Sequence, residues 1–220
     1  MTARLSFEHE LDILRENLIE MGQLIESAIE KTLEAFETQN EVLSNEIIEG
    51  DRNINDMEKT IEARCLSLIL KQQPVARDLR VVTTALKVVT DMERIGDHAA
   101  DIAELIIREK RVPIYNLTKN IPEMGKVAKS MVHDAVQAFT TINVEQAREI
   151  MIRDDIVDDL FDKVKEEVAF LLRASNEHVD QCVDTLMIAK YFERIGDHAV
   201  NICEWTEFHE TGSVNNIRIL

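Results

Sequence analysis

The heptapeptide Glu-Arg-Ile-Gly-Asp-His-Ala (ERIGDHA) occurs twice in this chain, at residues 93–99 and again at residues 193–199. The two copies are offset by 100 positions. A seven-residue identity at a fixed offset is typical of an internal duplication. We therefore expect the two halves of the chain to share one fold and to carry two copies of the same chemistry.

The composition around this repeat favours helices. Of 220 residues, only six are Gly and three are Pro, whereas 45% are hydrophobic, 30% are charged and 5% are aromatic. Few helix breakers and many Leu, Ile, Glu, Lys and Arg residues are typical of long helices rather than sheets. The composition therefore predicts an all-α protein.

Apolar residues recur at steps of three and four along most of the chain, which is the helical period. They predict six helices, over about 7–36, 42–70, 76–108, 122–140, 144–173 and 177–209. The segment 110–122 contains Pro113 and Pro122 and is the richest in helix breakers near the middle, so we place the domain boundary there. Long helices joined by short loops lie antiparallel. We expect two tandem three-helix bundles, residues 1–112 and 113–220, and make no prediction for the tail 212–220.

The net charge of −17 restricts the kind of partner. Nucleic acid and anionic lipid select basic surfaces, so cations and basic protein surfaces are the natural ligands of this chain. Cys65, Cys182 and Cys203 lack a CxxC spacing, which argues against a disulfide framework and against a thiolate zinc site. The N-terminal stretch MTARLSFEHELD does not predict a secretory segment, and no apolar run approaches the 18 residues expected of a spanning helix. We expect a cytoplasmic protein that meets the membrane only through partners.

Each ERIGDHA copy belongs to an acidic stripe on its helix. At 100° per residue, the acids fall on one face and the isoleucines on the opposite face. The stripe carries Glu93, Asp97 and Asp101 in the first copy, and Glu193, Asp197 and Asn201 in the second.

The preceding helix of each half carries matching groups. Pairing the helices as antiparallel hairpins sets Asp51 level with Asp97, Asn55 with Glu93, Asp154 with Asp197, and Asp158 with Glu193. Clustered like charges repel each other, so a cation is expected between them. Oxygen ligands suit Mg²⁺, Ca²⁺, Mn²⁺ or ferric iron, and zinc also accepts them. The alternative is a solvated acidic face flanked by Arg94 and Arg194.

Three motifs together resemble the PhoU family of phosphate-signalling proteins over nearly the whole chain: ERIGDHA in each third helix, EGDRNIN at 49–55 and QQPVARDLR at 72–80. The resemblance implies a cytoplasmic, non-enzymatic negative regulator of phosphate uptake and of the phosphate-starvation (Pho) regulon. It implies an adaptor that contacts the ATPase subunit of the phosphate ABC transporter (PstB type) and the sensor histidine kinase (PhoR type). It also suggests a homodimer, although the residues alone leave monomer and dimer open.

The same resemblance implies multinuclear iron or zinc clusters held by (E/D)xxxD motifs, with magnesium and manganese as alternatives. These motifs correspond here to Glu93 with Asp97, Glu193 with Asp197, and Asp154 with Asp158. In the remaining motif Asp51 pairs with Asn55, and Asn201 replaces an acid of the second stripe. Asparagine ligates only through a neutral carbonyl, so charge compensation can differ between the halves.

Three other functions fit parts of the pattern. One is a metal-free acidic scaffold serving another transporter. Another is a carboxylate-bridged di-iron enzyme, which is disfavoured because His98 and His198 directly follow aspartates instead of completing a Glu-x-x-His pair. The third is a DNA-binding repressor, which the charge of −17 opposes.

Overall fold

The computed structural model describes residues 3–108, 119–175, 177–214 and 217–218. The helices are α1 (Ala3–Thr38), α2 (Glu41–Gln72), α3 (Arg77–Arg108), α4 (Asn120–Thr141), α5 (Val144–Ala174) and α6 (Val179–Thr211). The predicted all-helical fold of two tandem three-helix bundles is confirmed. The tail, for which no prediction was made, adds the two-residue antiparallel strands β1 (Ser213–Val214) and β2 (Ile217–Arg218).

Local signals explain where the long helices begin and end. Asn40 caps α2 by accepting a hydrogen bond from the Leu43 backbone N–H at 3.2 Å, and Asn143 caps α5 by accepting one from Gln146 at 3.1 Å. Gln73 ends α2 in the left-handed conformation. Asn40 and Asn143 thus mark the turn at which the second helix of each three-helix half begins.

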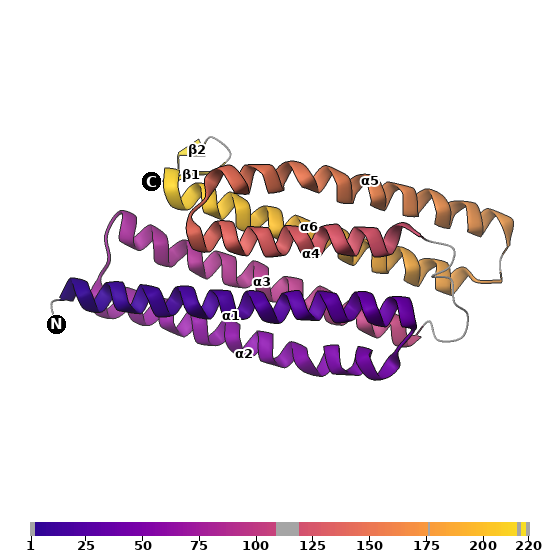
Figure 1. Cartoon of the computed structure of the whole chain (residues 1–220), viewed down its shortest axis with the longest axis horizontal. Coiled ribbons are helices and arrows are strands. Elements are labelled where there is room, and N and C mark those ends of the chain that lie inside the picture. Colours follow the sequence, from indigo (N-terminus) through magenta and orange to yellow (C-terminus); the bar gives the residue numbers. More distant parts are fainter. Residues whose placement is uncertain (1–2, 109–118, 176, 215–216, 219–220) are drawn as a thin grey trace.

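The two bundles lie side by side, and the helices of both run roughly along the long axis of the molecule (Figure 1). α1, α2 and α3 pack together, as do α4, α5 and α6, and the bundles meet through α3 against α6 and α1 against α4. Ile95, Ile102, Ile195 and Ile202 are fully buried, so the apolar faces opposite the acidic stripes form a core shared by both bundles. None of the helices in the described ranges is long and apolar enough to cross a membrane. The predicted domain boundary at 112/113 lies outside the described residues.

Candidate functional site

The first acidic cluster lies between α2 and α3. Gly96 of α3 packs against α2, and a Cβ at this position would lie 3.3 Å from Asp51 Oδ1. Asn55 donates a hydrogen bond to Asp51 Oδ2 at 2.8 Å. Asp97, one turn from Glu93, pairs with Arg94 at 2.8 Å. Asp51 of α2 therefore faces Glu93 and Asp97 of α3, with which its charge interacts, and Asn55 joins this cluster through its hydrogen bond to Asp51.

The second acidic cluster repeats this arrangement between α5 and α6. A Cβ at Gly196 would lie 2.9 Å from Asp154 Oδ1, so Asp154 meets α6 where Asp51 meets α3. The charges of Asp158, Asp197 and Glu193 all act on Asp154. The sequence predicted this convergence. A Cβ at Gly196 would collide with the carboxylate of Asp154, whereas a Cβ at Gly96 would first meet Ile54 at 2.9 Å, so each glycine allows a close approach of the two helices.

The two clusters differ in their resident cations. Lys190 donates to both carboxylate oxygens of Glu193 at 2.5 Å, and its Nζ lies 5.2 Å from the centroid of the Phe161 ring. The equivalent position in the first half is Thr90. Arg94 pairs with Asp97 in the first cluster, and Arg194 pairs with Asp197 in the second. Lys190 therefore adds a further positive charge that only the second cluster has at this position. The i, i+3 spacing of Lys190 and Glu193 was a signal for this pair that the sequence analysis missed.

Burial and mutual repulsion disfavour the ionised form of these acids. Burial, and then Asp97, raise the pKa of Asp51. Burial, followed by the charges of Asp158 and Asp197, raises the pKa of Asp154 to about 6. The pKa values of Glu93, Asp158 and Asp197 are also raised, chiefly by burial. An added cation would relieve the repulsion in both clusters.

The donor set suits a hard cation. Asp51 Oδ1, Asn55 Oδ1 and Asp154 Oδ1 are buried and have no hydrogen-bond partner within the described structure, which leaves oxygen lone pairs unused in each cluster. As they stand, the side chains of the described residues form no group of three or more His, Cys, Asp or Glu that could hold a metal ion. The residues fit a metal by chemistry, and side chains would have to turn toward it.

Asp101 and Asn201 lie at the edge of the clusters, where α3 meets α6. Asn201 donates to Asp91 Oδ1 at 2.9 Å, and His198 Nδ1 lies 2.9 Å from the same oxygen. The rings of His98 and His198 lie 5.5 Å apart between centroids. Asn201 thus joins the two bundles in the structure, and its predicted role as a ligand remains a prediction.

The sequence analysis did not single out Asp91. The residue 100 positions further along the chain is Tyr191, whose ring stacks on His98 with 5.4 Å between centroids. Asp91 therefore has no acidic counterpart in the second half, and the duplication does not reveal it. Asp91 contacts α6 across 107 residues of chain. A contact of this kind depends on how the bundles pack, which helical period alone does not reveal.

Comparison with known proteins points in one direction. The PhoU domain profile matches residues 18–106 and 121–206. The phosphate-specific transport system accessory protein PhoU homolog of Clostridium acetobutylicum is 41% identical over 207 residues, covering 94% of this chain and 94% of that protein. The PhoU accessory protein of Escherichia coli is 30% identical over 206 residues, covering 94% of this chain and 86% of that protein.

Two solved structures have the same architecture. The crystal structure of PhoU from Pseudomonas aeruginosa matches with a TM-score of 0.87 at 27% identity, covering 94% of this chain and 100% of that one. The phosphate transport system regulatory protein PhoU from Streptococcus pneumoniae matches with a TM-score of 0.88 at 29% identity, covering 96% and 100% respectively. The six-helix arrangement is therefore shared over nearly the whole length.

Proposed function

Since this chain belongs to the PhoU family, we propose that it is a metal-dependent adaptor that restrains phosphate uptake and the phosphate-starvation response. It is an accessory regulatory protein of phosphate-specific transport and not an enzyme. The adaptor works by docking, in the cytoplasm, to two partners: the ATPase subunit of the phosphate transporter and the sensor histidine kinase.

The observation that carries this proposal is the pair of matched acidic clusters, one on each bundle. Asp51, Asn55, Glu93 and Asp97 would hold a cation in the first. Asp154, Asp158, Glu193 and Asp197 would hold one in the second, with Asp101 and Asn201 at the edges. A bound iron, zinc, magnesium or manganese ion supplies positive charge that offsets the mutual repulsion of these acids.

The charge of the clusters links metal status to docking. Asp97 and Asp197 keep side-chain exposures of 30% and 39%, so the clusters contribute to the surface as well as to the interior. Filling them with cations makes the surrounding face less negative. A partner with a basic surface therefore binds the metal-free protein and the metal-filled protein with different affinities. This difference in binding free energy couples metal status to docking.

The direct test is binding of the purified ATPase subunit, and of the cytoplasmic part of the kinase, to the full chain with metal and with chelator. We expect affinity to change at least tenfold, and the Asp97→Asn/Asp197→Asn variant to lose the response. Asp56→Asn/Asp159→Asn is the matched control, because it removes two exposed charges outside the clusters. Equal affinity with metal and with chelator would contradict metal-dependent docking.

A metal-free acidic docking face is the second candidate. It is favoured by the contacts of Lys190 with Glu193 and of Arg94 with Asp97, which already balance part of the charge. On this alternative, chelator leaves partner affinity unchanged whereas the Asp97→Asn/Asp197→Asn variant still weakens it. The homodimer and the domain boundary at 112/113 rest on the family resemblance and on segment composition, and both remain proposals.

A further inference from the structure

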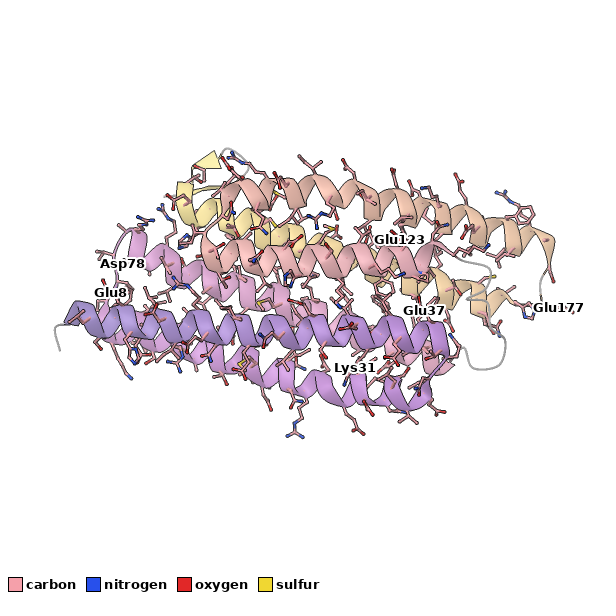
Figure 2. The ribbon with its side chains drawn as sticks, in the orientation of Figure 1. Glu8, Lys31, Glu37, Asp78, Glu123 and Glu177 are labelled. Carbon is pink, nitrogen blue, oxygen red and sulfur yellow. The ribbon has the colours of Figure 1, made fainter. Side chains whose placement is uncertain are left out.

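A cavity lies between the two bundles, far from the acidic clusters. It is found at the end of the molecule where α1 and α3 begin and where α4 and α6 end, near the labels of Glu8 and Asp78 in Figure 2. Its volume is about 210 Å³. The lining residues are Leu11, Leu14, Arg15, Leu18, Arg77, Val81, Ala85, Phe139, Thr140, Ile142 and His209.

His209 is the buried polar group of this cavity. It is 4% exposed, its ring meets that of Phe139 edge-on at 6.3 Å, and its Nδ1 has no hydrogen-bond partner among the residues that the structure describes. Burial lowers the pKa of His209, and nearby Arg77, Arg80 and Arg15 lower it further against the opposing charge of Glu210. The ring is therefore neutral at pH 7, and its unpaired nitrogen is available to a ligand.

Guanidinium groups supply the charge of the cavity. Arg15 and Arg77 line it and are 51% and 67% exposed, so they lie at its rim. Their acidic partners are Asp12 and Glu210, each at 3.3 Å, and ion pairs this exposed are weak and easily exchanged. A ligand carboxylate can therefore take the place of Asp12 or Glu210 on these two guanidinium groups at the mouth of an otherwise apolar cavity.

We propose that this cavity binds a small amphipathic carboxylate, with its apolar body among the leucines and its carboxylate between His209 and the rim arginines. An engineered cavity of about 150 Å³ binds benzene, so about 210 Å³ admits a short alkyl chain or a single ring. The apolar lining disfavours inorganic phosphate, which carries no apolar body to bury. The arginines disfavour a cationic amphiphile. This site lies apart from the acidic clusters, so its test is independent of the metal proposal.

Titration calorimetry with octanoate on the full chain tests the site. We expect saturable 1:1 binding that tightens about fourfold for each methylene added from hexanoate to octanoate. Acetate and octylammonium, which lack the apolar body and the negative charge respectively, are expected not to bind. No saturation by octanoate, or equal binding of octylammonium, would overturn the proposal.

Variants locate the binding. Arg15→Gln/Arg77→Gln alters only rim side chains and is expected to weaken octanoate at least tenfold, whereas Arg52→Gln/Arg173→Gln removes the same charge outside the cavity and should leave it unchanged. His209→Phe keeps a ring but deletes the donor, and is expected to weaken binding about tenfold. Full binding by the rim variant would place the ligand elsewhere and overturn the assignment.

An anionic lipid offers the same chemistry as a free carboxylate. Co-sedimentation with phosphatidylglycerol vesicles is therefore measured in parallel. We expect the protein to stay in the supernatant while octanoate binds. Capture by vesicles without binding of octanoate would replace the small-ligand site with a lipid contact.

Discussion

Among single residues, Asp154 shows most clearly what the acidic clusters cost the fold. Its pKa is raised from 3.8 to about 6, first by burial and then by Asp158 and Asp197. Between about pH 4 and pH 6 the folded state therefore binds more protons than the unfolded state, and stability falls as the pH rises through this window. Above about pH 6 Asp154 is ionised in both the folded and the unfolded state, and the full loss of stability is present.

We expect Asp154→Asn to stabilise the metal-free protein at pH 8 by about 1 kcal/mol, a value discounted because the side chain is only partly buried. At pH 4 the gain should disappear, because the wild-type carboxyl is then mostly protonated. Thermal melts in EDTA at both pH values measure this. Asp159→Asn on the exposed side of α5 is the control, and an equal shift for both variants would show that Asp154 carries no special penalty.

Gly96 and Gly196 allow the acidic clusters to form, at the expense of helix stability. Gly50 has nothing within 4 Å of an added Cβ, so Gly50→Ala should stabilise α2 by up to about 1 kcal/mol. In Gly196→Ala the new methyl would push the carboxylate of Asp154 away from its position 2.9 Å from this Cβ. We expect this variant to gain less stability and to bind Mn²⁺ more weakly, whereas Gly50→Ala binds it normally. Titration with Mn²⁺ and thermal melts compare the pair; unchanged Mn²⁺ affinity in Gly196→Ala would separate the glycine from the site.

Much of the site could be predicted because its residues belong to regular helices. Once Asp97 is assigned to a helical face, hairpin pairing brings Asp51 opposite it, and the second half repeats the result with Asp197 and Asp154. The cation of Lys190 and the bridge made by Asp91 could not be obtained in this way. Each departs from the duplication, and the Asp91 bridge depends on how the bundles pack.

Among the helices, α3 and α6 form the joint between the two bundles. Arg108 at the end of α3 makes a two-pronged ion pair with Asp184 of α6, including a bond from Nε to Oδ2 at 2.8 Å. The Asp184 side chain is 9% exposed, so it depends on this partner for charge compensation. The pair crosses from one half to the other and ties their packing together.

We expect Arg108→Met to destabilise the chain by about 1–2 kcal/mol, because it removes the ion-pair partner of the buried Asp184 carboxylate. This loss of stability is smaller than that for a fully buried ion pair, because the Arg108 side chain is 64% exposed. Adding Asp184→Asn should recover part of the loss. Urea unfolding measures both, with Arg52→Met as the exposed control. Additive effects of the two substitutions would show that the pair does not act as a unit.

The helices themselves could be predicted from apolar period, with small errors at their ends. α4 begins at Asn120, before the Pro122 where the prediction started it, because proline is tolerated in the first helical turn where its missing N–H has no partner to lose. α6 begins at Val179, two residues later than predicted. Such differences move no site residue, since the clusters lie several turns from the helix ends.

In the whole molecule, the duplication sets two acidic clusters on two bundles that share one core, in a chain of net charge −17. Each cluster keeps buried carboxylate oxygens without partners among the described residues. Helical packing accounts for where these oxygens lie. We propose that a bound cation would explain why the fold tolerates them.

Elemental analysis of protein purified without an affinity metal is the most direct test of this view. Wild type and Asp97→Ala/Asp197→Ala would be incubated with iron, zinc, magnesium or manganese, passed through a desalting column and measured for metal per chain. We predict stoichiometric metal in the wild type and its loss in the double variant. A wild type without metal, or a variant that retains as much as the wild type, would contradict the assignment of the clusters as ligands.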